Sequence, residues 1–259
     1  MESYYTKYLK YKSKYLHLVN ILKGGEKIGT GLFGIVFRPP LRCEVRKEEY
    51  EISEYVGKIM TEKNALEELS NSDKVKALDP EGEWSITVVH TSSFMKEQPQ
   101  EKDYDIKYYE EYPTQLISKF GGSTLKKIIN WDEEFPNVLN IDKLPLLIQL
   151  IKRTIPIIDK LNVLYFHNDL HLDNIIYNEH DNKLRLIDFG KLTSISDITD
   201  IGAKCDFEEF FYSVKSLLRN SNQIKTTYKD HFKAWLKIYP TDCHQFKDAL
   251  LNIPEIKII

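Results

Sequence analysis

This chain of 259 residues has few cysteines, no long apolar run and almost no net charge. Its three cysteines, Cys43, Cys205 and Cys243, lie far apart and form no Cys-x-x-Cys pair. The sequence therefore predicts neither a disulfide framework nor a zinc site, and it favours a reducing, intracellular compartment. No apolar stretch approaches the roughly 18 residues that a membrane span needs, so we expect no membrane partner. The first residues also lack the uninterrupted apolar segment of a signal peptide.

The charge balance argues against nucleic acid as the main ligand. Lysine and arginine number 36 and aspartate and glutamate 39, which leaves a net charge of −3. Nucleic-acid binding requires a concentrated positive surface, and this composition does not predict one. The length is sufficient for one large domain or two lobes with a substantial core.

The most informative segment is residues 167–174, which read His-Asn-Asp-Leu-His-Leu-Asp-Asn and precede Asp188-Phe189-Gly190. Asn174 follows Asp169 by five positions, and Asp188 follows Asn174 by fourteen, with short β-type segments between them. Phosphoryl transfer needs one carboxylate to orient a hydroxyl and accept its proton, while an amide and a second carboxylate hold Mg²⁺. A tripeptide such as Asp-Phe-Gly recurs by chance, but the ordered pair of motifs is specific.

A glycine-rich segment near the start fits a phosphate-covering loop. Residues 28–37 read Ile-Gly-Thr-Gly-Leu-Phe-Gly-Ile-Val-Phe. Glycines let the backbone approach phosphate oxygens, and the alternating apolar residues predict two strands joined by a turn. A dinucleotide-binding turn would need a helix after Gly34, whereas Pro39 and Pro40 end the second strand here.

Together these motifs resemble the protein kinase-like superfamily over residues 26–218. The resemblance implies an α+β, bilobal fold with a β-rich N-lobe at residues 26–120 and a compact, helical C-lobe at 121–259. It implies a nucleotide cleft between Gly31 and Asp188 and a short activation segment. The implied activity is an ATP-dependent kinase that uses Mg²⁺ or Mn²⁺.

The resemblance also assigns roles to individual residues. Asp169 is the implied catalytic base, and Asn174 and Asp188 are the implied metal ligands. Lys58, on a strand at 55–60, is expected to contact the α/β-phosphates and to pair with a glutamate of a helix at 62–78. We prefer Glu68, although spacing alone does not separate it from Glu67. The residues assigned to the nucleotide are Ile28, Gly29, Gly31, Phe33, Gly34, Val36, Lys58, Glu68, Lys119 and Gly121.

A strand at 114–119 is expected to lead into the hinge between the lobes. The backbone of residues 119–121 is then implied to bond the adenine edge. Either Ile117 or Ser118 is expected to lie at the back of the adenine pocket, and a shift of one residue in the strand register decides which of the two it is.

Two further segments carry structural predictions. Apolar residues recur at three and four from Leu144 to Ile158, which predicts one long buried helix. A second helix beginning near Asp206 resembles the central helix of the kinase C-lobe, whose first aspartate bonds the catalytic-loop backbone. His167 is expected to be a packed histidine that orients this loop. A zinc site formed with His171 is disfavoured, because the loop contains no His-Glu-x-x-His.

Residues 1–25 predict a basic amphipathic helix that ends in a Gly-Gly linker, because Tyr4, Tyr8, Tyr11 and Tyr15 recur at helical spacing among lysines. The segment either packs on the small lobe or serves as a docking tag. It resembles the Tyr/Lys-rich starts of many proteins of giant DNA viruses, and the chain resembles the Ser/Thr protein kinases of those viruses. A viral origin would place the protein in the host cytoplasm or the virion.

The chain departs from the family at three places. Asn168 stands where protein kinases carry arginine, and His171 stands where Ser/Thr kinases carry lysine. Only fifteen residues separate Gly190 from Asp206, and no Ala-Pro-Glu occurs. Three hypotheses follow: a Ser/Thr kinase with a protein substrate, a small-molecule kinase of the aminoglycoside or choline kinase type, and a non-catalytic pseudokinase.

Overall fold

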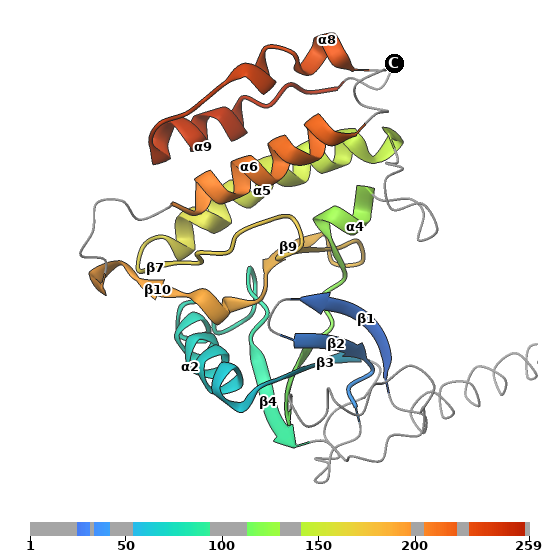
Figure 1. Cartoon of the computed structure of the whole chain (residues 1–259), viewed down its shortest axis with the longest axis vertical. Coiled ribbons are helices and arrows are strands. Elements are labelled where there is room, and N and C mark those ends of the chain that lie inside the picture. The colour runs from blue at the N-terminus through green and yellow to red at the C-terminus, as the bar shows by residue number, and fades with distance from the viewer. Residues whose placement is uncertain are drawn as a thin grey trace, which may run out of the picture. The chain divides into compact units, whose positions relative to one another are not determined.

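The protein has an α+β architecture that divides into two compact units (Figure 1). A computed structural model describes residues 25–31, 34–41, 54–93, 113–129, 141–197, 205–221 and 228–256. The first unit is Met1–Asp73 with Thr87–Phe120, and the second is Lys74–Ile86 with Gly121–Ile259. The α+β class expected from the sequence is therefore confirmed. The expected helix before Gly25 and the loop residue Phe33 lie outside the described residues.

The first unit is built on a five-stranded antiparallel sheet with strand order β1-β2-β3-β5-β4. Ile59 and Met60 are consecutive in β3 and therefore point to opposite faces. One face carries a cluster of Ile35, Phe37, Leu41 and Ile59, and the other a cluster of Met60, Ala65, Val88 and Leu116. The strands and the helix after β3 are β1 (Glu26–Gly31), β2 (Gly34–Arg38), β3 (Tyr55–Met60), α2 (Glu62–Leu78), β4 (Val88–Ser93) and β5 (Thr114–Lys119).

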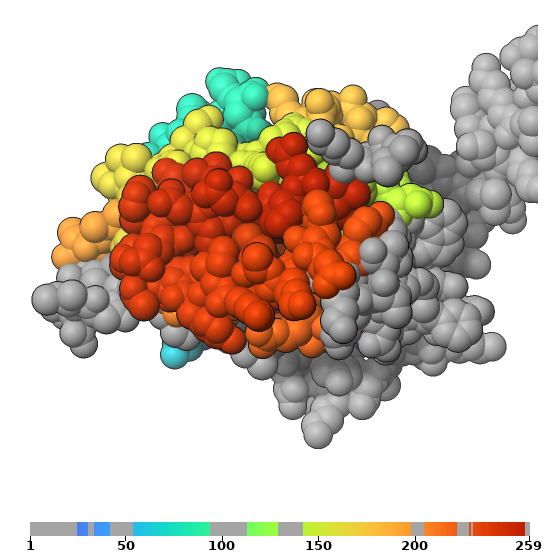
Figure 2. All heavy atoms as spheres, turned by 90° about the horizontal axis from the view of Figure 1, so that it is seen from above, coloured from blue at the N-terminus to red at the C-terminus, as the bar shows by residue number. Residues whose placement is uncertain are grey.

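The second unit is mainly helical, and its longest helix is α5 (Leu144–Leu161). One face of α5 is buried along its whole length, as the apolar spacing of the sequence predicts. α9 packs against both α5 and α6, and Figure 2 shows the C-terminal elements, in red and orange, covering one face of the unit (Figure 1). The other helices are α4 (Leu125–Ile129), α6 (Asp206–Asn220), α8 (Lys229–Phe232) and α9 (Cys243–Leu251).

Short strands and 3₁₀ turns of the second unit frame the segment that contains the Asp-Phe-Gly motif. One small sheet has the order β6-β8-β9, and a second pairs β7 with β10. The strands are β6 (Ser123–Thr124), β7 (Tyr165–Phe166), β8 (Ile175–Asn178), β9 (Lys183–Leu186) and β10 (Thr193–Ser194). The 3₁₀ turns are η2 (Ile141–Lys143), η3 (Phe189–Lys191), η4 (Ile195–Asp197) and η5 (Trp235–Lys237).

A disulfide joins Cys205, which precedes α6, to Cys243, the first residue of α9. The two Cα atoms lie 5.8 Å apart although 38 positions separate the residues in the sequence. The expectation that the cysteines stay unpaired is therefore wrong for this pair, because helix packing, not sequence spacing, brings them together. No helix within the described ranges is long and apolar enough to cross a membrane. The compartment stays a prediction.

Candidate functional site

The 167–174 loop of the second unit is held by the first residue of α6. Asp206 accepts hydrogen bonds from the backbone N–H groups of His167 (2.9 Å) and Asn168 (3.0 Å), one at each carboxylate oxygen. Its side chain is fully buried. Burial raises the pKa of Asp206 above its ordinary value of 3.8, although the hydrogen bond from His167 works in the opposite direction. The expected bond from this aspartate to the loop backbone is confirmed.

Two further residues of α6 bond the same loop. The Glu209 carboxylate accepts from the N–H of Leu170 at 2.9 Å, and the Ser213 hydroxyl accepts from the N–H of Leu172 at 3.2 Å. Residues 206, 209 and 213 follow one another at three and four positions, so they share one helix face. This face satisfies the N–H groups of residues 167, 168, 170 and 172, and it thereby fixes the loop path.

His167 is a packed residue at the base of the loop. It is fully buried, and its ring centroid lies 5.3 Å from that of Phe189. Its Nε2 lies 2.9 Å from the carbonyl oxygen of Ile187, which can only accept, so Nε2 carries the proton. The other ring nitrogen, Nδ1, has no hydrogen-bond partner in the described part of the chain. The expected packed histidine is thus confirmed, and it ties the loop to the Asp-Phe-Gly segment.

The β8–β9 hairpin brings Asn174 next to Asp188. Ile175 pairs with Leu186 in this hairpin, and the N–H of Ile187 donates to the carbonyl of Asn174 at 3.1 Å. Asn174 therefore lies directly across from the residue before Asp188. Asp188 itself has left-handed backbone angles (φ 63°, ψ 65°), which aspartate and asparagine adopt more readily than most residues. The hairpin thus brings together two backbone positions, one of which carries an amide and the other a carboxylate.

Residues 84–86, which precede β4, run alongside β9 of the hairpin and bond its last residue. The N–H of Leu186 donates to the carbonyl of Trp84, and the N–H of Ile86 donates to the carbonyl of Leu186, both at 2.9 Å. Asp79 accepts from the N–H groups of Glu83 and Trp84, also at 2.9 Å, which fixes the turn after α2. The N–H and the carbonyl of Leu186, two residues before Asp188, are consequently both bonded to this segment.

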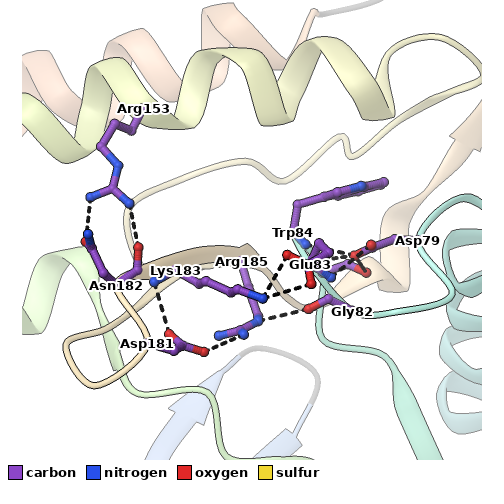
Figure 3. A network of polar contacts seen from close by, with 10 residues as sticks. Asp79, Gly82, Glu83, Trp84, Arg153, Asp181, Asn182, Lys183 and Arg185 are labelled. Carbon is purple, nitrogen blue, oxygen red and sulfur yellow. Dashed lines mark hydrogen bonds and ion pairs between the residues drawn. The ribbon is translucent and has the colours of Figure 1, made fainter.

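Charged side chains reinforce this packing (Figure 3). Arg185 bonds the carbonyl of Gly82 at 3.0 Å and the carboxylate of Asp181 at 2.6 Å. Lys183 bonds Glu83 at 2.8 Å. The network links the hairpin to the 79–86 segment.

Within the loop, the Asn174 amide is oriented by the backbone of Asp169. Its Nδ2 donates to the Asp169 carbonyl at 2.9 Å, which leaves Oδ1 as the atom that a cation could bind. Oδ1 of Asp169 lies 3.0 Å from Nζ of Lys191. His171 faces the end of the loop, where its Nδ1 accepts from the N–H of Asp173 at 3.2 Å. The three residues predicted for phosphoryl transfer, Asp169, Asn174 and Asp188, therefore all lie in the second unit.

In the first unit, Lys58 pairs with Glu68. Lys58 Nζ lies 2.7 Å from Glu68 Oε2, and the two side chains are 16% and 11% exposed. Glu67, the alternative left open by the sequence, is exposed on the outer side of α2. A half-buried ion pair of this geometry fixes the lysine rotamer, because neither charge has free access to water.

The sheet register decides which residues share a face with Lys58. Lys58 lies opposite Val36 on β2 and Leu116 on β5, and residues directly opposite one another point to the same face. Ser118 lies opposite Val56, two positions from Lys58, so it shares that face as well. Ile117 lies opposite Gly57 and points to the other face. Of the two candidates left open by the sequence, Ser118 is therefore the one on the same face as Lys58.

The glycine-rich segment forms the β1–β2 hairpin. Gly31 pairs with Gly34 at its end, and an irregularity of register separates Lys27 from Gly29. Among the residues that the structure describes, a Cβ at Gly29 would come near only the Cβ of Val36, at 3.9 Å, so these residues leave the backbone open to approach. A Cβ at Gly34 would lie 3.3 Å from the backbone carbon of Ile59, which explains the glycine by close packing.

The remaining predicted nucleotide residues lie on these elements or at their ends. Ile28 is half-buried on β1. Lys119 is the exposed last residue of β5, and the next N–H, that of Phe120, donates to the carbonyl of Glu54 at 2.7 Å. Gly121 is buried at the start of a segment of the second unit, and a Cβ there would lie 3.3 Å from Ile176.

Sequence reasoning missed two residues of this site. Lys191 directly follows Phe189-Gly190, and its position after the motif is the only sequence signal for its contact with Asp169. Glu209 follows Asp206 by three positions on a helix whose first aspartate was already expected to bond the loop, so helical periodicity could have indicated it.

The chain matches no known protein-family model, and the curated proteins contain no significant match to it.

Proposed function

We propose that this chain is an ATP-dependent phosphotransferase with a bilobal, protein kinase-like fold, acting as a Ser/Thr kinase on a protein hydroxyl. The observation that carries the proposal is the hairpin register that sets Asn174 beside Asp188, with Asp169 in the same loop. This is the residue set that phosphoryl transfer requires, and it lies within one compact unit.

The donor set fits a magnesium or manganese ion. Mg²⁺ prefers oxygen ligands and is usually bound by one or two carboxylates together with substrate phosphates and water. Asp188 supplies one carboxylate, and the bond from Asn174 to the Asp169 carbonyl leaves the amide oxygen as a second donor. When bound, the ion neutralises phosphate charge.

The chemistry assigned to the loop is a proton transfer coupled to phosphoryl transfer. Asp169 orients the acceptor hydroxyl and takes its proton as the hydroxyl oxygen bonds to the γ-phosphorus. The bond from that phosphorus to the β–γ bridging oxygen breaks, and the bridging oxygen keeps the electron pair and leaves as part of ADP. Because the transition state is loose, positioning and charge supply most of the rate.

In the first unit, the proposal assigns the nucleotide to the face of the sheet that carries Lys58. Lys58, held by Glu68, contacts the α/β-phosphates, while the backbone of Gly29, Gly31 and Gly34 covers them. Val36 shares this face. In the proposal its side chain packs against the adenine ring of the nucleotide. Ile28 and Phe33 complete the cover, and the backbone at Lys119 and Gly121 bonds the adenine edge.

A transfer assay tests the proposal. Wild-type protein is incubated with MgATP labelled at the γ-phosphate, generic protein substrates and a panel of amino alcohols and sugars. Asp169→Asn should lower kcat by about 10²- to 10⁴-fold, the usual cost of a lost general base. Asp230→Asn, an exposed aspartate of α8, is the matched control and should keep full activity. ATP binding by a wild-type protein that transfers to no acceptor would favour a pseudokinase instead.

The acceptor class is tested at His171. His171→Lys introduces the residue typical of Ser/Thr kinases and should retain or raise transfer to protein. With a small acceptor bound directly by the loop, the longer cation should collide with it and lower activity. Transfer to the amino-alcohol panel alone would contradict the protein-kinase assignment while leaving phosphotransfer intact.

A further inference from the structure

We propose that Lys191 is a positioning residue of this phosphotransfer site and supplies beside Asp169 the cation that the 167–174 loop lacks. The inference rests on the proposed function and names a residue that the sequence motifs do not include. It connects two departures from the kinase pattern. Asn168 bonds the backbone of Lys191, and the Lys191 ammonium lies beside the Asp169 carboxylate, which His171 does not contact through either ring nitrogen.

The first observation is the contact at the carboxylate. Lys191 Nζ lies 3.0 Å from Asp169 Oδ1, and the side chains are 41% and 29% exposed. An ammonium at one carboxylate oxygen fixes the side-chain rotamer and leaves the second oxygen to accept a proton. The lysine thus orients the group that must meet the acceptor hydroxyl.

The second observation is that His171 does not occupy this place. Its Nδ1 accepts from the N–H of Asp173 at 3.2 Å, and its Nε2 lies 3.3 Å from the amide nitrogen of Asn174. Both ring nitrogens therefore face the end of the loop. His171, which stands where Ser/Thr kinases carry a lysine, therefore does not bind the Asp169 carboxylate through either ring nitrogen, and Lys191 does so instead.

The third observation is how the backbone of Lys191 is held. The Asn168 amide donates to the Lys191 carbonyl at 3.2 Å. Asn168 has a φ of 57°, a left-handed conformation that asparagine tolerates better than most residues. Asn168, where the family carries arginine, thereby anchors the turn whose side chain reaches Asp169.

The same turn is fixed at both ends. The buried Phe189 ring precedes it, and the N–H of Leu192 donates to the Phe189 carbonyl at 3.1 Å. Thr193 then pairs with Phe166 in the β7–β10 sheet. Lys191 therefore projects from a turn with defined geometry. A solvent-exposed ion pair adds little to folding stability, so its contribution lies in orienting Asp169.

The decisive experiment compares Lys191→Met with Lys247→Met in the full-length chain. Lys247 of α9 forms an ion pair of similar exposure with Asp159 of α5 at 2.7 Å and serves as the matched control. Lys191→Met should lower kcat by about 10²-fold, the cost of a misplaced reacting group, with KM for ATP and the melting temperature unchanged. Lys191→Arg should restore most of the activity, and Lys247→Met should match the wild type.

A double variant tests whether Lys191 acts through Asp169. In an Asp169→Asn background, Lys191→Met should cause no further loss, because residues that act as a unit are not additive. An independent, multiplicative loss would overturn the inference. So would an undiminished kcat for Lys191→Met in a protein whose wild type transfers phosphate.

A labelling experiment reports the contact without turnover. Limited acetylation of surface lysines, followed by mass spectrometry, should modify Lys191 faster in Asp169→Asn than in the wild type, with Lys247 unchanged. Equal rates at Lys191 would overturn the inference whether or not the protein is an active kinase. A wild type without any transfer activity would overturn the proposed function, and the catalytic role of Lys191 with it.

Discussion

Glu68 Oε2 lies 2.7 Å from Lys58 Nζ, and Glu67, its neighbour in the sequence, points away from the sheet into solvent. If Lys58 contacts the phosphates as proposed, Glu68→Gln should lower kcat/KM for ATP by about 10- to 10²-fold, because loss of the glutamate charge weakens the ion pair that fixes the lysine rotamer. Glu67→Gln removes the same charge one residue away and should leave kcat/KM unchanged. Steady-state kinetics at varied ATP concentration measures both. Equal effects of the two substitutions would contradict the assignment.

Asp188→Asn should abolish magnesium-dependent transfer. The substitution removes the negative charge but keeps the shape and the tolerance for the left-handed backbone at φ 63°. The folding stability should therefore stay near that of the wild type, while calorimetric titration should show the loss of Mg²⁺-dependent ATP binding. Asp197→Asn, an exposed aspartate of η4, is the control and should behave as the wild type. Undiminished turnover of Asp188→Asn would show the metal assignment to be wrong.

Gly57 of β3 packs against the buried side chain of Gln115 on β5. Gln115 is fully buried, accepts from the N–H of Leu41 at 2.8 Å and donates to its carbonyl at 3.1 Å. A Cβ at Gly57 would lie 2.7 Å from Gln115 Cδ. Gly57→Ala should thus displace this bonded amide and lower the free energy of unfolding by about 1–3 kcal/mol.

The matched control for Gly57→Ala is Gly29→Ala, whose new methyl group would lie 3.9 Å from the Cβ of Val36, an ordinary van der Waals contact. Its effect on urea unfolding should be close to zero, whereas its effect on nucleotide affinity should be measurable. A Gly57→Ala variant as stable as the wild type would show that Gln115 can move without cost.

Asp206 should give the protein a measurable pH dependence. Burial raises its pKa in the folded state above the ordinary value of 3.8, so the folded protein binds this proton more tightly than the unfolded chain. Between 3.8 and the raised pKa, the free energy of unfolding of the wild type should fall with rising pH relative to Asp206→Asn. Above that window the difference should be constant. Urea titrations of both proteins at several pH values measure it, and parallel curves would contradict the shift.

Local patterns in the sequence were sufficient for several of these features. The apolar spacing from Leu144 to Ile158 predicts α5, because one helix face must be buried whatever it packs against. The glycines between β1 and β2 predict the hairpin for a similar reason, since the backbone conformation is local. The spacing from Asp169 to Asp188 gave the candidate residue set, because a strand–turn–strand unit of that length brings its two ends together.

Contacts between distant segments required the tertiary structure. Glu67 and Glu68 are equivalent by spacing, and only the rotation of α2 against β3 selects Glu68. Ile117 and Ser118 differ by one residue of register, which is fixed by pairing with β3. The assignment of Lys74–Ile86 to the second unit depends on bonds to Leu186 that no local pattern encodes.

The amino-acid sequence by itself determined which chemical groups are available and the order in which they occur, because motif spacing and periodicity are properties of the chain. Only the tertiary structure decided which of them touch. Cys205 meets Cys243 through the packing of α6 and α9, and Lys191 meets Asp169 through a turn anchored by Asn168. These contacts arise from the burial of apolar surface by whole elements, which places side chains together regardless of their separation along the chain.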